Sequence, residues 1–224
     1  MTVITISRQY GSGGDEIADR LCQVLGYQQF DKRLITQAAA EAGISEKEVY
    51  DYSEENHKVQ SFLDRLFSRA ALVSSGPMWG DISGTYVPLE EEQLSEEVMQ
   101  SLVQKAIRSA HQMGNMVILG RGSQVLLQNE PEVLHVRIEA ALEERIQRVK
   151  EQLKTEQQSY QADVDIRRQA QDLIEQRDYA SYDYIKRFYQ ANWINPLLYH
   201  VILNTSKLSL ERATQLILDL VTEN

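Results

Sequence analysis

The stretch ITISRQYGSGGDEIADRL at residues 4–21 decides the fold of this chain. It opens with a β-branched run, passes through a glycine-rich segment at residues 7–14, and continues with apolar residues at helical spacing as far as Gly26. The predicted order is strand, glycine turn, helix. Glycines in such a turn let successive N–H groups approach an anion at the start of the helix. The alternative interpretation is an ordinary tight turn between a strand and a helix.

The same pattern of a short apolar run followed by helical spacing recurs along the chain. Further strands are expected at residues 27–30, 116–119, 133–138 and 201–203. Strands that alternate with helices predict an α/β fold with a parallel sheet and helices on both faces. Ligands of such sheets sit at the carboxyl ends of the strands. We therefore expect three segments to converge there, namely Ser7–Glu16, Asp31 and Gly120–Gly122.

Composition excludes several classes of function. The chain has 224 residues, with 33 Asp and Glu against 23 Lys and Arg, so its formal net charge is −10. This balance argues against nucleic acid and anionic membranes as partners, because both require a basic face. The single cysteine, Cys22, fits a reducing compartment. With no signal-peptide pattern at the N-terminus, we expect a cytoplasmic protein.

Five segments resemble one known family, in that family's order. They are ISRQYGSGGDEIADRL at 6–21, FDKRLI at 30–35, VILGRGSQVLL at 117–127, HVRIEAALEERIQRV at 135–149 and LYHVILNTSKLSLERA at 198–213. The chain is similar to the cytidylate kinase-like family of P-loop proteins. The resemblance implies a P-loop NTPase-type five-stranded parallel sheet flanked by helices, with a helical insertion and a long helical lid region. As one domain, its core would cover about 1–44, 94–144 and 197–224, the insertion about 45–93, and the lid about 145–196.

The resemblance also implies an activity and the residues that carry it. The activity would be phosphoryl transfer from ATP, with Mg²⁺, to a nucleoside monophosphate or a similar small acceptor. Arg121, Arg145 and Arg148 would be the catalytic residues. The nucleotide and its phosphates would be bound by Arg8, Gly11, Ser12, Gly13, Gly14, Asp31, Arg177 and Asp178. The partner would be a small-molecule nucleotide, and the sequence leaves a homo-oligomer open.

The sequence departs from the family pattern at the phosphate loop itself. The pattern places Lys on the β- and γ-phosphates and then a hydroxyl on Mg²⁺. Here Gly14 stands in place of the Lys, and Glu16 in place of the hydroxyl. Arg8 could reach over the turn instead, and restoring Lys at position 14 is expected to strengthen triphosphate binding. Glu16 could hold Mg²⁺, but an acidic residue also suits the first turn of a helix without any metal.

Three further alternatives follow from the same residues. Arg121 at a strand end suits a bidentate phosphate ligand, or else a structural ion pair. Arg145 and Arg148 share a helix face, which fits either a lid over the transferring phosphoryl group or a solvated face paired with neighbouring glutamates. Gly122 replaces the Asp of the family's Gly-Arg-Asp motif. At the level of function, the alternative to a kinase is a non-catalytic nucleotide-binding or interaction protein, a pseudokinase that lost the phosphate-loop Lys.

Overall fold

The computed structural model describes residues 3–30, 32–41, 96–157 and 163–222. Its centre is a five-stranded sheet with the order β2-β3-β1-β4-β5, in which every pair of neighbours is parallel. The strands are β1 (Val3–Arg8), β2 (Gln28–Gln29), β3 (Met116–Leu119), β4 (Val133–Glu139) and β5 (Val201–Asn204). The predicted α/β class and the predicted strands are confirmed.

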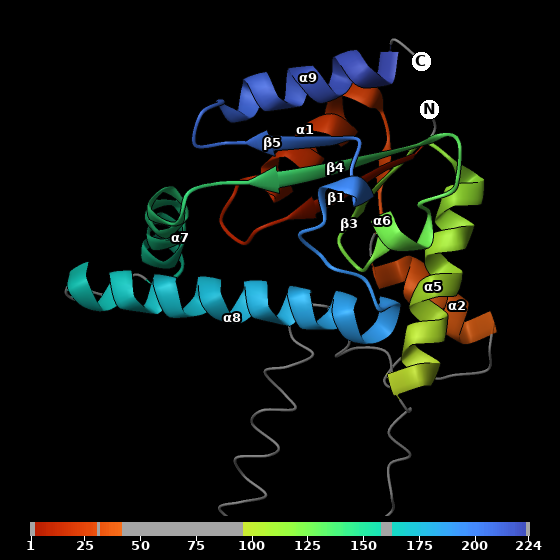
Figure 1. The fold of residues 1–224 in the computed structure, drawn as a ribbon, viewed down its shortest axis with the longest axis horizontal. Helices are drawn as coiled ribbons and strands as arrows, with labels where there is room; N and C mark the ends of the chain where they lie inside the picture. The colour runs from red at the N-terminus through yellow and green to blue at the C-terminus, as the bar shows by residue number, and fades with distance from the viewer. Residues whose placement is uncertain (1–2, 31, 42–95, 158–162, 223–224) are drawn as a thin grey trace, which may run out of the picture.

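Helices cover both faces of this sheet (Figure 1). On one face α1 (Gly14–Leu25) packs beside α9 (Leu210–Thr222), and on the other α2 (Lys32–Glu41) packs beside α5 (Glu96–Met113). Each face of the sheet has its own hydrophobic core, and alternate residues of β1 point into one or the other. Ile4 and Ile6 pack in the core on the α1–α9 side, whereas Val3 packs in the core on the α2–α5 side. No helix in the described ranges is both long and apolar enough to cross a membrane.

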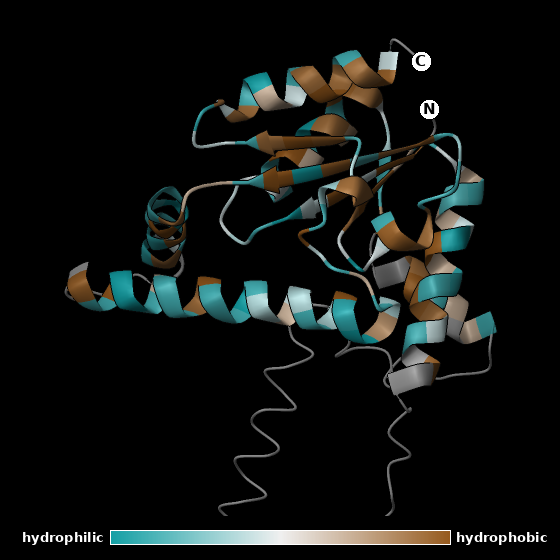
Figure 2. Ribbon diagram, viewed as in Figure 1, coloured by the Kyte–Doolittle hydropathy of each residue, from teal (hydrophilic) through white to brown (hydrophobic). Residues whose placement is uncertain are grey.

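The segment between β4 and β5 consists largely of two helices, α7 (Leu142–Gln157) and α8 (Asp163–Tyr189). They pack on each other, and α8 runs along the side of the molecule where α7 also lies (Figure 1). In Figure 2, α8 is hydrophilic over most of its length, whereas the strands are mainly hydrophobic. The long helical region that the resemblance implied is confirmed in the described residues.

Two short elements were not expected from the sequence. A one-turn helix, α6 (Ser123–Leu126), follows β3, and a 3-10 turn, η1 (Pro196–Leu198), precedes β5. The expected insertion at 45–93 lies outside the described residues, so the division of the chain into core, insertion and lid remains a prediction.

Candidate functional site

The glycine turn between β1 and α1 has a backbone that requires glycine. Gly11 and Gly13 have φ of 76° and 84°, in the left-handed region that side chains disfavour. A Cβ on Gly11 would lie 2.8 Å from Val149 Cγ2 of α7, and one on Gly13 would lie 2.5 Å from Leu210 Cδ2 of α9. The turn is therefore packed against two helices. The N–H groups that follow it, at the start of α1, have no partner inside the helix and carry the positive end of its dipole.

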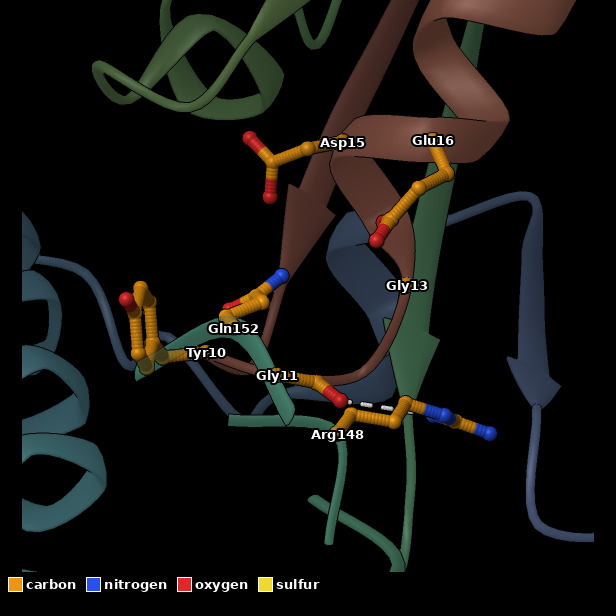
Figure 3. Close-up of a pocket in the computed structure, with 7 residues that line it drawn as sticks. All are labelled: Tyr10, Gly11, Gly13, Asp15, Glu16, Arg148 and Gln152. Atoms are coloured by element: carbon orange, nitrogen blue, oxygen red, sulfur yellow. Dashed lines mark hydrogen bonds between the residues drawn. The ribbon is translucent and has the colours of Figure 1, made fainter. Parts of the chain in front are cut away.

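The carbonyl groups of this turn are held by side chains from elsewhere in the chain. Arg145 of α7 donates to Tyr10 O at 3.3 Å, and Arg148 donates to Gly11 O at 3.3 Å (Figure 3). Thr205, just after β5, donates from Oγ1 to Ser12 O at 2.7 Å. Because the carbonyls face the protein, the opposite side of the turn can present N–H groups to a ligand, as an anion-binding nest requires.

A cavity of about 270 Å³ opens at the turn. It is lined by Tyr10, Gly11, Gly13, Asp15, Glu16, Arg148 and Gln152. A second cavity of about 460 Å³ shares Glu16, Arg148 and Gln152 with the first, extends along α7 to Thr155 and is also lined by Leu210 of α9. Figure 3 shows the two carboxylates on the first turn of α1, on the other side of the glycine turn from Arg148. The two cavities thus adjoin each other at Glu16, Arg148 and Gln152.

The charges around the first cavity do not by themselves suit a polyphosphate. Asp15 and Glu16 contribute two carboxylates, and Arg148 contributes one guanidinium that is already bonded to Gly11 O and Thr205. Bound phosphates would therefore require added positive charge. Carboxylate oxygens are the ligands that Mg²⁺ prefers, and Mg²⁺ is commonly held by one or two carboxylates and substrate phosphates. The residues present fit Mg²⁺ together with a nucleotide, Glu16 being the ligand expected from the sequence.

Arg8 ends β1 directly before this turn. Its side chain is only 13% exposed, and its Nη2 lies 3.3 Å from Asp15 Oδ1 while Nε lies 3.5 Å from Oδ2. The guanidinium therefore lies at the first turn of α1, where the pattern's Lys would otherwise bring a charge.

Arg177 and Asp178, which were expected to bind the nucleotide, lie around Tyr10 together with Arg145, which was expected to be catalytic. Asp178 of α8 accepts the Tyr10 N–H at 2.8 Å and pairs with Arg145 at 2.5 Å, and the Arg177 guanidinium carbon lies 5.7 Å from the centre of the Tyr10 ring. Arg145 is buried, at 7% exposure. The structure therefore joins Arg145, Arg177 and Asp178 to the glycine turn. Their roles toward a nucleotide remain predictions.

Arg121 lies in a tight turn at the end of β3. Gly120, Arg121 and Gly122 all have positive φ, of 69°, 59° and 72°, and Ser123 N–H donates to Gly120 O at 3.2 Å. Gly120 N–H donates to Ile6 O at 2.9 Å, which places the turn beside the end of β1. The two glycine-containing strand ends are thus neighbours. Asp31, the third segment expected here, lies outside the described residues.

Two aromatic residues, Phe30 and Tyr189, lie next to Arg121. Its guanidinium carbon lies 6.0 Å from the centre of the Phe30 ring, and Tyr189 at the end of α8 donates to its carbonyl at 2.9 Å. A Cβ on Gly122 would lie 2.1 Å from Tyr189 Cε2. Any side chain at position 122 would therefore meet the Tyr189 ring in its present place.

A buried polar layer at the carboxyl end of the sheet was not anticipated. Arg137 is 1% exposed, lies 4.3 Å above the Trp193 ring, and donates to Glu139 at 2.6 Å and to Trp193 O at 3.0 Å. Trp193 in turn donates from Nε1 to Ser7 Oγ at 2.8 Å. The signal was present in the alternation of HVRIE at 135–139, which places His and Arg on one face of a strand and Val and Ile on the other.

His135 belongs to this layer. It shares a 2.6 Å hydrogen bond with Thr5 Oγ1, and its ring stacks on that of His200 at 5.1 Å. Burial, and secondly the proximity of His200, lower the pKa of His135 to about 4. The imidazole is therefore neutral at physiological pH.

Three solved structures are similar to this chain over nearly its whole length. A solved structure of an uncharacterized protein from Eubacterium ventriosum ATCC 27560 is 15% identical, with a TM-score of 0.65 and all of both chains covered. A shikimate kinase from Acinetobacter baumannii, solved in complex with shikimate, is 12% identical, with a TM-score of 0.44 over 100% of this chain and 94% of its own. A second shikimate kinase, from Bacteroides thetaiotaomicron, is 13% identical, with a TM-score of 0.48 over 99% and 98%.

The family comparison is more specific than these structural likenesses. None of the curated proteins compared with the chain matches it. The model of the cytidylate kinase-like family matches residues 3–207, which include the glycine turn, the Arg121 turn and both helices between β4 and β5. With most of its length matched, the chain belongs to the cytidylate kinase-like family and has that family's kinase-type α/β fold.

Proposed function

We propose that this protein is a cytoplasmic phosphotransferase that binds ATP with Mg²⁺ at the glycine turn. It passes the γ-phosphoryl group to a nucleoside monophosphate or a similar small acceptor. The observation that carries the proposal is the construction of the turn. Its carbonyls at residues 10–12 are bonded to Arg145, Arg148 and Thr205, and a cavity opens at its side.

Donor binding follows from the start of α1. The N–H groups there and the positive end of the helix dipole face the phosphates. Mg²⁺ supplies charge neutralisation of the β- and γ-phosphates when it is bound. Glu16, on the rim of both cavities, is the residue proposed to hold it. The remainder of the nucleotide extends along α7 into the larger cavity.

The acceptor is proposed to bind near Arg121, at the neighbouring strand end. An acceptor phosphate oxygen attacks the γ-phosphorus, a new P–O bond forms, and the bond to the β-phosphate oxygen breaks to release ADP. A nucleoside monophosphate is already ionised at its phosphate, so the chain need not supply a strong base. The chemistry then depends on positioning and charge, which a fixed guanidinium provides.

The alternative is a non-catalytic nucleotide-binding protein. Two observations favour it. The turn has Gly14 in place of Lys, and Arg145, one of the expected catalytic arginines, is buried in an ion pair with Asp178. Such a protein would bind a nucleotide at the turn and leave it unchanged.

One pair of measurements separates these functions. Purified protein is incubated with ATP, Mg²⁺ and each nucleoside monophosphate in turn, and ADP release is followed in a coupled assay. Calorimetry with ATP and Mg²⁺ is run alongside. We expect binding and acceptor-dependent ADP release. Binding without acceptor-dependent release contradicts the kinase and supports the alternative, whereas absence of binding contradicts both.

The matched variants are Arg148→Ala and Arg212→Ala. Arg148 donates to the turn and to Thr205, whereas Arg212 is exposed at the start of α9. Loss of its hydrogen bond to Gly11 O and of its two hydrogen bonds to Thr205 is expected to lower ATP affinity at least ten-fold in the first variant. The second variant should bind ATP as the parent does.

A further inference from the structure

Residues 8 and 14 share one space. A Cβ built on Gly14 would lie 2.6 Å from the Cβ of Arg8 and 2.8 Å from its Cγ. Heavy atoms of side chains do not approach so closely, because optimal carbon contacts lie near 3.5–4.0 Å. The stem of Arg8 therefore occupies the position from which any side chain at residue 14 would leave the helix.

The backbone of Gly14 does not explain why this residue is glycine. Gly14 is not among the glycines of positive φ, unlike Gly11 and Gly13 on the same turn. It is the first residue of α1, where glycine is a weaker helix former than alanine. The packing of Arg8 is thus the reason for glycine at this position. This geometry also changes the expectation for Lys at position 14, since that side chain cannot be added while Arg8 keeps its place.

We propose that the phosphate-binding cation of this turn is Arg8, delivered from the end of β1, and that Gly14 is glycine to admit it. In the free protein Asp15 holds the guanidinium at the first turn of α1. The inference rests on the proposed function and names the residue that replaces the missing Lys. The ligand it recognises is the phosphate chain of a nucleoside triphosphate.

The chemistry of the Arg8 side chain suits a phosphate-binding role in place of the missing Lys. A guanidinium has five N–H donors in a planar fork, so it can keep one carboxylate and still donate to phosphate oxygens. The side chain of Arg8 is largely buried, which fixes its stem and directs its head along the start of the helix. A largely buried charge also interacts more strongly with a phosphate than a solvated one does.

The test is a cycle of four proteins: the parent, Arg8→Gly, Gly14→Lys and the double variant. Glycine is used at position 8 because the Cβ of Arg8 is itself the atom nearest to the added side chain. Each protein is titrated with ATP and, separately, with tripolyphosphate, both with Mg²⁺, in a calorimeter. Each is also melted without ligand. Arg20→Ala serves as the control. Arg20 lies on α1 and, like Arg8, forms an ion pair with a carboxylate, in this case that of Glu211.

Arg8→Gly is expected to weaken binding of both ligands roughly ten-fold or more, by loss of a charge-assisted contact. Gly14→Lys alone should lower the melting temperature and gain no affinity. The double variant should recover both affinity and melting temperature relative to the single variants, and Arg20→Ala should bind as the parent does. This non-additive pattern is the signature of two positions that share one space.

Other outcomes would overturn the inference. If Arg8→Gly binds as tightly as the parent, Arg8 does not bind the phosphates. If Gly14→Lys gains the same affinity with and without Arg8, and melts as the parent does, the two positions are independent. If the parent binds neither ligand, the proposed function fails. If the double variant alone binds in that case, Arg8 does not replace the Lys, although the melting temperatures still report the shared space.

Discussion

The carboxylate of Asp178 accepts the backbone N–H of Tyr10 at 2.8 Å, and so ties helix α8 to the glycine turn 168 residues earlier in the chain. Arg145 completes the connection, because its Nη1 lies 2.5 Å from Asp178 Oδ2 and 3.3 Å from Tyr10 O. The conformation of the turn therefore depends on α7 and α8 as well as on β1 and α1. In this protein the helices between β4 and β5 support the glycine turn directly.

Asp178→Ala is expected to lower the free energy of unfolding by about 2–4 kcal/mol, because it leaves the buried Arg145 guanidinium without its counter-charge. It also removes the acceptor of the Tyr10 N–H. Asp178→Asn keeps an acceptor oxygen but not the charge, so its loss should be smaller. Urea denaturation of the three proteins measures the difference, and ATP affinity should fall in the same order.

The matched control is Asp172→Asn, an exposed carboxylate on the same helix, which should change the free energy of unfolding by less than about 0.5 kcal/mol. Equal stabilities for the Asp172 and Asp178 variants would show that the ion pair with Arg145 does not hold the turn.

Stability should fall as the solution is acidified from neutrality, because His135 resists protonation in the folded protein. Its pKa is about 4 when folded, owing first to burial and then to His200, against about 6.5 in an unfolded chain. Above pH 6.5 both states hold the neutral ring, so His135 has no effect there. Between about pH 6.5 and 4 only the unfolded state gains a proton, which costs the folded state at most about 3 kcal/mol.

The measurement is the free energy of unfolding in urea at pH 7, 6 and 5, a range above the titration of ordinary carboxylates. His135→Gln should show a shallower decline than the parent, at the cost of lower stability at pH 7. His200→Gln removes the neighbouring ring and should show a decline between the two. If the parent and His135→Gln lose stability in parallel from pH 7 to 5, another group is responsible.

The sequence was sufficient for the elements of this fold because their signals are local. The apolar run of β3 is bounded by Gly114 and Gly120, and the helical spacing of α1 ends at Gly26, which adopts the left-handed conformation of a helix cap. The order of strands in the sheet was not specified, since it depends on contacts between distant segments. The one-turn helix α6 was missed because four residues are too short to show a periodicity.

The candidate site was predictable in its residue types but not in their contacts. Spacing placed Arg145 and Arg148 on one helix face. It did not show that both side chains donate hydrogen bonds to the glycine turn, about 135 residues earlier in the chain. The sequence also did not show that a side chain at position 14 would collide with Arg8, because this depends on the direction in which the Arg8 side chain leaves β1. Contacts of this kind are fixed by tertiary packing, and no local pattern records them.

The glycine at position 122 is expected to be required by Tyr189. Gly122→Ala places a Cβ 2.1 Å from the present position of Tyr189 Cε2, at a residue with φ of 72°. Strain of the backbone and displacement of the ring should together lower the free energy of unfolding by about 2–3 kcal/mol. Thermal melting detects this loss. In a Tyr189→Leu background the same Ala should cost less, since only the backbone strain remains, and an equal cost in both backgrounds would exclude the ring as the cause.

The proposed acceptor site is best tested by Arg121→Gly. Arg121 has φ of 59°, a conformation that glycine adopts freely but alanine does not. Glycine therefore removes the guanidinium without adding strain, and Arg121→Ala, which carries the same backbone strain as the parent, is the companion variant that removes the guanidinium alone. If Arg121 binds the acceptor phosphate, kcat/KM for the acceptor should fall at least ten-fold while ATP affinity stays unchanged. The melting temperature should change little.

Arg121→Lys separates the effect of the planar, bidentate guanidinium from the effect of its positive charge. Lys keeps a positive charge but presents a single ammonium, so bidentate recognition of phosphate predicts activity between those of the parent and the Gly variant. Lys also bears the same backbone strain as Arg, which makes its stability comparable with that of the parent. A Gly variant that retains full activity but melts at a lower temperature would assign Arg121 to packing over Phe30, and the acceptor would then have to bind elsewhere.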